Sequence, residues 1–238
     1  MKRNNRSLTR RNFIAGTVAV AGALSHRPSL AQPNAAALHE RAARRGLLFG
    51  VMVTRNMLEK DRDCQQAVIR DAAIIVTGDE MKWGHVEARR GALNFADADW
   101  VANFARQNRL SLRAQPAVWA QNVPPWLSAA MASEAGAVLL RNHVTNVVAR
   151  YSGRAQQWDV VNEALEPLNK QPGGFRNSIF YKALGHEYIA TAFRVAKSAD
   201  PHAKLYYNDY GVEYSSPDED ARRRALLALL TALKRDNV

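Results

Sequence analysis

Asn162 and Glu163 are the residues of this sequence whose types and position best suit chemistry. The run 157–162 ends at Asn162, and Glu163 follows it directly; within the run, Trp158, Val160 and Val161 favour a buried strand. A loop rich in Pro and Gly follows directly. In an α/β barrel, the carboxyl ends of the strands hold the catalytic groups, so Glu163 is a candidate acid or base. The alternative is an ordinary strand that ends in a solvated glutamate.

Polar and aromatic side chains also follow the other predicted strands. They are Lys82 and Trp83, Trp119 and Gln121, and Asn208 to Tyr210. The rings expected to line one cleft are those of Trp83, Trp119, Trp126, Tyr207 and Tyr210. Flat rings beside carboxylate, amide and ammonium groups suit a sugar, which presents both C–H faces and hydroxyls. Filling of the core is an equally good role for Trp100 and Trp158.

Strands and helices alternate along the chain. The predicted strands are 47–53, 73–77, 110–118, 157–162 and 204–208. The predicted helices are 38–45, 60–70, 98–107, 133–150, 178–199 and 218–234, with Ser133 and Ser178 as N-caps and a stop at Asp200-Pro201. This alternation predicts a parallel sheet with right-handed crossovers.

Two layouts fit such a sheet: an open doubly wound sheet and a closed (β/α)8 barrel. No G-x-G-x-x-G follows the first strand, where the sequence reads Phe49-Gly50-Val51-Met52. A dinucleotide-binding fold therefore loses support. Polar residues after each strand favour a TIM barrel with its site at the C-terminal face.

Three segments resemble glycoside hydrolase family 10, the retaining endo-β-1,4-xylanases with a (β/α)8 barrel. WDVVNEA, residues 158–164, resembles the acid/base segment of that family. LYYNDY, residues 205–210, resembles its fifth-strand segment, and EMKW, residues 80–83, the end of its second-strand segment. The resemblance extends from about Leu38 to the C-terminus.

The resemblance implies a role for each candidate site residue. Glu163 would be the general acid/base, and Asn162 would hold the 2-hydroxyl of the sugar. Lys82 and Trp119 would line the subsite just before the cleaved bond. Asn208 and Tyr210 would also bind substrate, which is expected to be xylan or xylo-oligosaccharide. No cofactor is expected.

Two segments depart from the family pattern. The family usually has E-N-x-M-K-W, whereas Gly78 and Asp79 stand in the first two positions here. In the third-strand segment, usually G-H-T-L-V-W-H, Gln115 and Ala120 replace the two histidines. His143 is predicted to be structural and not a substitute. The effect of these departures on substrate choice stays open.

The resemblance also implies a barrel that is incomplete in this sequence. The family nucleophile is a Glu after the seventh strand, whereas about five β/α units are expected here, within residues 38–238. A sequence truncated in this way is expected to lack the nucleophile and to aggregate, to be only partly ordered, or to self-associate through its open barrel edges. The alternatives are a catalytically inactive carbohydrate-binding protein and an unstable gene fragment.

Residues 1–31 resemble an export signal. Arg10 and Arg11 form a twin-arginine pattern, the apolar run 13–24 is too short for a stable membrane anchor, and Ser29-Leu30-Ala31 suits cleavage near Ala31. These features predict recognition by the twin-arginine export machinery and a periplasmic or secreted product. Residues 32–37 are expected to be a linker.

Charge and cysteine content exclude other classes of protein. The net charge of +11 includes six basic residues of the predicted signal. Without them, 27 basic and 22 acidic residues remain, a net charge of +5, which is no argument for nucleic acid binding. Cys64 is the single cysteine, so an internal disulfide is impossible and a cysteine metal site is not expected.

Overall fold

The computed structural model describes residues 36–133 and 135–238. The predicted export signal, 1–31, and most of the predicted linker lie outside the described residues. Within the described part, no helix is long and apolar enough to cross a bilayer.

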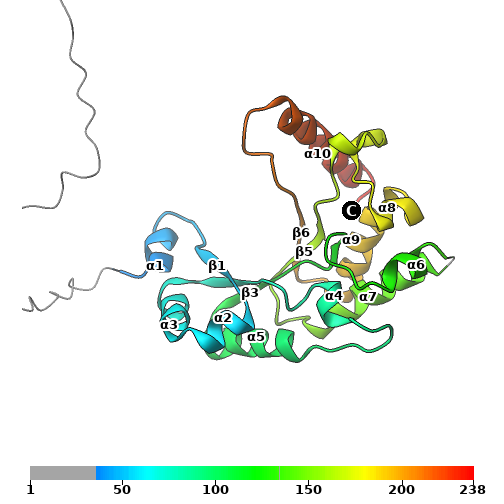
Figure 1. Ribbon diagram of the computed structural model, residues 1–238. Coiled ribbons are helices and arrows are strands. Elements are labelled where there is room, and N and C mark those ends of the chain that lie inside the picture. The colour runs from blue at the N-terminus through cyan, green and yellow to red at the C-terminus, as the bar shows by residue number, and fades with distance from the viewer. Residues whose placement is uncertain (1–35, 134) are drawn as a thin grey trace, which may run out of the picture. The chain divides into compact units, whose positions relative to one another are not determined.

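A single parallel sheet forms the centre of the described unit (Figure 1). Its strands are β1 (Gly50–Val53), β2 (Ile74–Thr77), β3 (Ser111–Ala114), β4 (Val118–Trp119), β5 (Gln157–Asn162) and β6 (Lys204–Asn208). One edge of β5 pairs with β3 and then β4, and its other edge pairs with β6. Neighbouring strands thus follow one another along the chain, the order of a barrel and not of a doubly wound sheet.

The third predicted strand, 110–118, is broken into β3 and β4, so its prediction as one element is wrong. Pro116 lies in the break, and it has no N–H to donate to a neighbouring strand. At the break, the backbone N–H of Gln115 donates a hydrogen bond to the side-chain oxygen Oγ1 of Thr77 at 3.0 Å. Ala117 then resumes pairing by donating to the Asp159 carbonyl at 3.0 Å.

The long helices follow the outer side of the curved sheet (Figure 1). The α-helices are α1 (Leu38–Ala43), α2 (Arg55–Lys60), α3 (Arg62–Asp71), α4 (Trp83–Val86), α5 (Ala96–Gln107), α6 (Leu127–Met131), α7 (Gly136–Arg150), α8 (Ile179–Leu184), α9 (Glu187–Ala199) and α10 (Pro217–Arg235). Two short 3-10 turns, η1 (Pro167–Asn169) and η2 (Pro172–Gly174), lie in the loop after β5.

Three helix predictions need correction. The helix predicted at 60–70 is preceded by α2, and Asp61 separates α2 from α3 by capping Cys64 N at 2.9 Å. The helix predicted at 178–199 is interrupted at Gly185, whose φ of 64° ends α8. Ser178 caps α8 as predicted, whereas Ser133 caps nothing: its hydroxyl donates to the Ala130 carbonyl, and α7 begins at Gly136.

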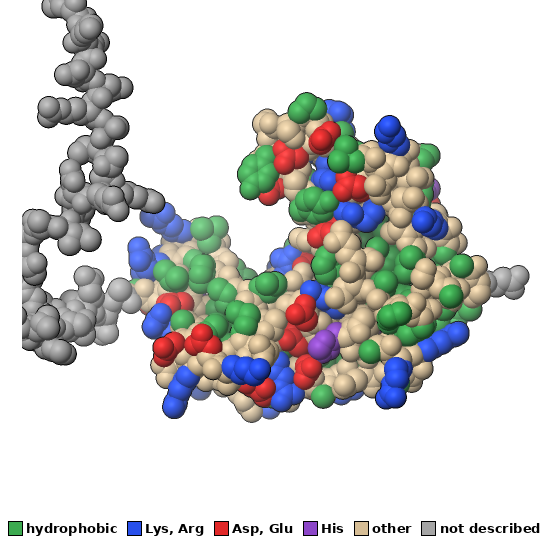
Figure 2. Space-filling view, viewed as in Figure 1, with side chains coloured by type: hydrophobic (Ala, Val, Ile, Leu, Met, Phe, Trp, Pro, Cys, Tyr) green, Lys and Arg blue, Asp and Glu red, His purple; other side chains and the backbone are tan. Residues whose placement is uncertain are grey.

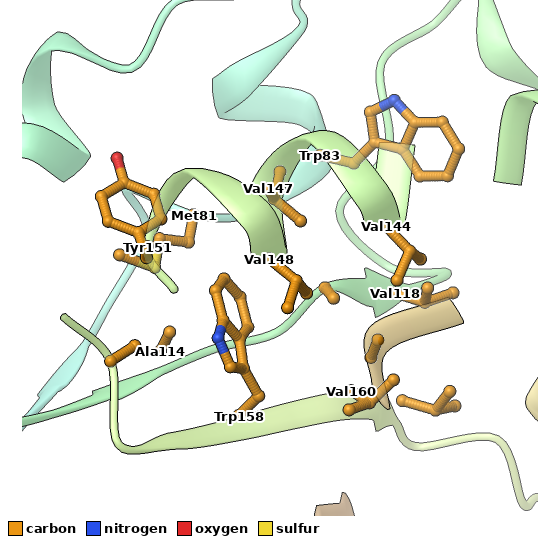
Figure 3. Packing of buried hydrophobic residues seen from close by; sticks show 14 of the residues in the cluster. Met81, Trp83, Ala114, Val118, Val144, Val147, Val148, Tyr151, Trp158 and Val160 are labelled. Carbon is orange, nitrogen blue, oxygen red and sulfur yellow. The ribbon is translucent and has the colours of Figure 1, made fainter. Parts of the chain in front are cut away.

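The core lies between the sheet and its helices, and Trp158 is at its centre (Figure 3). Trp158 is fully buried and packs toward Val148 of α7 and Tyr151, the residue that directly follows α7. Burying an aromatic ring of this size removes 150–250 Å² of surface from water. Trp158 is therefore a core residue, one of the two roles that the sequence allowed.

The concave face of the sheet carries charged side chains. Side chains alternate along a strand, so Asp159 lies on the opposite face from Trp158, and Arg113 lies opposite Leu112. Arg113 Nε donates to both Asp159 carboxylate oxygens at 3.1 Å. These strands therefore have one apolar face and one face with paired charged groups. Met52 of β1 is on the same face of the sheet as Arg113 and is 59% exposed. Figure 2 shows that the surface is hollowed between the α1–β1 side and the α10 side.

Candidate active site

The C-terminal ends of β4, β5 and β6 bring three predicted site residues into register. Trp119 of β4 pairs with Asn162 of β5, which pairs in turn with Asn208 of β6. Asn208 Nδ2 donates to Asn162 Oδ1 at 2.6 Å, and Asn162 is buried. These amides are therefore already oriented before any ligand arrives.

Glu163 leaves the strand in an unusual backbone conformation. Its φ is 52°, in the left-handed region, which few residues other than glycine adopt. Its amide donates to the Asn208 carbonyl at 2.8 Å, and its own carbonyl accepts from Arg176 Nε at 2.7 Å. This turn directs the side chain to Trp119, whose Nε1 donates to Glu163 Oε2 at 3.0 Å. The Glu163 side chain keeps 17% of its surface exposed, so a ligand can reach it.

Lys82 completes one side of the site. Its ammonium nitrogen lies 4.9 Å from the centre of the Trp119 ring and 2.5 Å from Asp79 Oδ1. The structure thus brings together Lys82, Trp119, Asn162, Glu163 and Asn208. They present a carboxylate, an ammonium, two amides and an indole ring.

Tyr210 lies on the β6 side of the site. The residue is 44% exposed, and the centre of its ring lies 4.3 Å from the Arg222 guanidinium carbon. Its hydroxyl donates to Glu166 Oε2 at 2.8 Å and accepts from Arg176 Nη2 at 3.2 Å. An exposed ring held from behind in this way is a flat platform beside Glu163.

Sequence reasoning missed the charged residues behind this platform. Arg222 of α10 donates to the Leu165 carbonyl at 2.5 Å and to Glu166 Oε1 at 3.0 Å. Burial alone would raise the pKa of Glu166, but hydrogen bonds from Tyr210 and Arg222 outweigh it and lower that pKa. Arg176 and Arg222 lie in no recognised motif, so no local signal could have found them.

Two of the aromatic residues predicted to line the cleft do not line it. Trp83 is buried and stacks on His143 with ring centroids 3.8 Å apart. Tyr207 lies beneath the Glu163 turn, where its hydroxyl donates to Asp209 and accepts from Ala164 N. Burial, and then the Asp209 charge, raise the pKa of Tyr207. Both rings support the site without facing it.

Trp126 and Gln121 lie nearer the surface. Trp126 precedes α6, and its Nε1 donates to the Glu87 carbonyl at 3.0 Å. Gln121 lines a polar cleft of about 850 Å³ together with Asp79 and Arg55. Because Asp79 also contacts Lys82, this cleft continues the site toward β1 and β2.

His143 has the structural role that was predicted. It is buried, and its Nε2 lies 3.0 Å from the Ala117 carbonyl, to which it can donate. Burial lowers the pKa of His143 to about 3. In residues 36–133 and 135–238, no three His, Cys, Asp or Glu side chains gather where they could hold a metal ion.

Comparison with known proteins gives one consistent family. Residues 37–238 match the family model described as glycosyl hydrolase family 10. Endo-1,4-beta-xylanase 3 of Hypocrea jecorina is 37% identical over 168 residues, which are 70% of this chain and 47% of that protein. Endo-1,4-beta-xylanase 1 of Humicola insolens is 35% identical over 194 residues, 80% of this chain and 44% of that protein. The chain thus spans about half the length of these relatives.

Solved structures agree with these sequence matches. The crystal structure of xylanase 10B from Thermotoga petrophila, in complex with xylobiose, superimposes with a TM-score of 0.76 and 30% identity, covering 85% of this chain and 60% of that one. Native xylanase 10B from Thermotoga maritima superimposes with a TM-score of 0.74 and 30% identity, and the match covers 85% of this chain and 61% of that one. The sequential parallel sheet, the residues at its C-terminal edge and a family match over 37–238 agree, and the chain belongs to glycosyl hydrolase family 10.

Proposed function

We propose that this chain carries the acid/base half of a retaining endo-1,4-β-xylanase. The observation that carries the proposal is the position of Glu163 at the end of β5, with Trp119 on its carboxylate and Lys82, Asn162 and Asn208 around it. The names of the relatives, and the xylobiose in one similar structure, support xylan as the substrate.

The proposed mechanism assigns one task to each group. Glu163 protonates the leaving oxygen and afterwards takes a proton from the attacking water. Asn162 accepts or donates a hydrogen bond at the sugar 2-hydroxyl, a contact that strengthens in the transition state. Lys82 and Trp119 line the subsite before the cleaved bond, and Tyr210 offers its ring on the leaving-group side.

A mechanism that retains the configuration at the anomeric carbon requires a second carboxyl group about 5–5.5 Å from the first. Nearby carboxylates in the described part are already engaged: Glu166 by Tyr210 and Arg222, and Asp209 by Tyr207. General acid catalysis alone contributes about 10²–10⁴-fold, well short of the acceleration typical of enzymes. We therefore propose that the nucleophile comes from polypeptide outside this sequence.

The test compares this chain alone with the same chain fused to the C-terminal half of a family 10 xylanase. Release of reducing sugar from xylan is expected only from the fusion. Glu163→Gln should abolish most of that release, whereas Glu187→Gln, an exposed site on α9, should not. Clear xylan hydrolysis by the unfused chain would contradict the proposed source of the nucleophile.

A second candidate function is carbohydrate binding without turnover. It is favoured by the ordered amide pair and the exposed Tyr210 ring, which need no nucleophile to hold a sugar. Calorimetry with xylohexaose, together with the activity of the fusion, separates the two candidate functions. A carbohydrate-binding protein would bind xylohexaose tightly, and its fusion to the C-terminal half of a xylanase would stay inactive.

We also propose that the protein is exported, on the basis of Arg10, Arg11 and the small residues before Gln32. Replacing both arginines with lysine should retain the protein in the cytoplasm. Cell fractionation measures this, and unchanged export of the lysine variant would refute the assignment.

A further inference from the structure

We infer that Arg176 is a positioning residue for Glu163, an inference whose catalytic meaning rests on the function proposed above. Arg176 lies between η2 and α8, and its side chain is 15% exposed. Its Nε donates to the Glu163 carbonyl at 2.7 Å, and its Nη2 lies 4.0 Å from Glu163 Oε2. One guanidinium thus reaches both the main chain and the carboxylate of the same residue.

The main-chain contact matters because Glu163 has a φ of 52°. Backbone conformations of this kind persist in residues other than glycine only where the surroundings hold them. Here the Glu163 amide is held by Asn208 and its carbonyl by Arg176. Without Arg176, one of these two supports is lost, and the turn is free to relax toward an ordinary conformation.

The side-chain contact distinguishes the two carboxylate oxygens. Oε2 accepts the Trp119 Nε1–H at 3.0 Å and also faces Arg176, which is always charged. Both neighbours favour a lone pair over a proton on Oε2. The geometry therefore leaves Oε1 as the oxygen that carries and delivers the proton.

Arg176 is itself fixed from behind. Its Nη2 lies 3.2 Å from the Tyr210 hydroxyl and 3.6 Å from Glu166 Oε2, and Arg222 holds the other oxygen of Glu166. A planar guanidinium can serve these acceptors and Glu163 at once, whereas a lysine ammonium on a flexible stem cannot. Arg176→Lys is therefore a sensitive variant, because it keeps the charge and loses the geometry.

The test uses the Trp119 indole N–H as a reporter in the chain as it exists, labelled with ¹⁵N at tryptophan. Trp119→Phe assigns its signal, and Glu163→Gln shows how far that signal moves when the charged acceptor is replaced by an amide. Arg176→Lys and Arg176→Gln should move the Trp119 signal at least half as far. The indole signals of buried Trp83 and Trp158 should stay in place and show that the core is intact.

Arg154→Lys is the matched control, because Arg154 precedes β5 at its other end and pairs with Asp99 and Asn103. It should leave the Trp119 signal unchanged. An unmoved Trp119 signal in Arg176→Gln with an intact core would overturn the inference. If both Arg176 variants unfold, hydrogen exchange in the unmodified chain provides the test. The Arg176 Nε–H should exchange with solvent more slowly than the Nε–H of exposed Arg70. Equal exchange rates would overturn the inference.

A kinetic measurement on the completed fusion tests the catalytic meaning separately. Arg176→Lys should lower kcat about 10- to 100-fold with little change in KM, as expected for a displaced catalytic group. The loss should be smaller on activated aryl glycosides, whose leaving groups need little protonation. If the fusion hydrolyses no xylan, the proposed function fails, and the Trp119 signal still decides whether Arg176 positions Glu163.

Discussion

Glu163 combines a partly exposed carboxylate with a backbone conformation that its neighbours hold in place. The strand that precedes it is buried, its pairing with β6 shifts in register between Asp159 and Val161, and the left-handed turn begins at Glu163, the proposed acid/base. Strained conformations of this kind concentrate at functional sites. The conformation thus supports the choice of Glu163 over the other carboxylates near β5 and β6.

The acid role of Glu163 predicts a dependence on the leaving group. In the completed fusion, Glu163→Gln should lower kcat/KM by about 10²–10⁴-fold on xylan, because protonation of the leaving oxygen is lost. Activated aryl xylosides should lose much less. Steady-state kinetics on both substrates measure this, and an equal loss on the two would argue against an acid.

His143 predicts a pH dependence of stability. Its pKa is lowered to about 3 in the folded chain, whereas an unfolded histidine has a pKa of about 6.5. The unfolded state therefore binds the proton first, and the free energy of unfolding falls as the pH drops from about 6.5 toward 3. The contribution of this one group is about 1.4 kcal/mol per pH unit within that window.

His143→Phe keeps a ring against Trp83 and removes the titration. It should cost about 1–3 kcal/mol at pH 7, because the Ala117 carbonyl loses its donor. Its stability should then fall less steeply than that of the unmodified chain between pH 6.5 and 3. Urea unfolding at several pH values measures both slopes, and parallel curves would show that His143 is not the titrating group.

At the scale of elements, the start of α2 explains the glycine at position 78. A Cβ on Gly78 would lie 2.5 Å from Thr54 Cγ2 and 3.2 Å from the Val53 carbonyl oxygen. Thr54 is the N-cap of α2, and its hydroxyl accepts from Met57 N at 3.2 Å. The Thr54 methyl therefore occupies the space that a larger residue at 78 would need.

This packing predicts a coupling between two neighbouring positions. Gly78→Ala should destabilise the chain by about 1–3 kcal/mol through overpacking. Thr54→Ser keeps the capping hydroxyl and removes the methyl, so the double variant should recover part of the loss, with a coupling of about 1 kcal/mol. Urea unfolding of the four proteins measures it, and strictly additive effects would exclude the contact.

At the scale of the molecule, the described sheet has two edges with one neighbour each. Within the described part, β1 pairs with β2 and β6 pairs with β5. Leu47, Leu48 and Met52 are exposed beside the β1 edge. Unpaired edges beside apolar side chains favour association with other chains.

The chain by itself is therefore expected to self-associate. Met52→Lys should lower its mean mass in analytical ultracentrifugation, because a charge on an edge strand opposes pairing. Val138→Lys, at an equally exposed apolar site on the outer helix α7, should not. A monomeric unmodified chain with a sharp thermal transition would refute the expectation.

The sequence alone determined the elements whose signals are local. Strands 157–162 and 204–208 were predicted with their observed bounds, because apolar runs bounded by turns need no distant partner to be recognised. Alternation predicted the parallel sheet, polar residues after each strand favoured a barrel over a doubly wound sheet, and Glu163 followed from its place after a strand. Lys82, Trp119, Asn162 and Asn208 are gathered around it in the structure as the motifs implied.

Only the tertiary structure decided which rings face the site and what holds Glu163 in place. Trp83 and Trp119 are equally plausible cleft residues in sequence, and packing against His143 removes Trp83 from the cleft. Glu166 and Arg176 lie in the loop after β5, whereas Arg222 lies in α10, 56 residues beyond Glu166, so the three meet only once α10 has packed against that loop. Such long-range contacts depend on chain closure in three dimensions, which no local periodicity records.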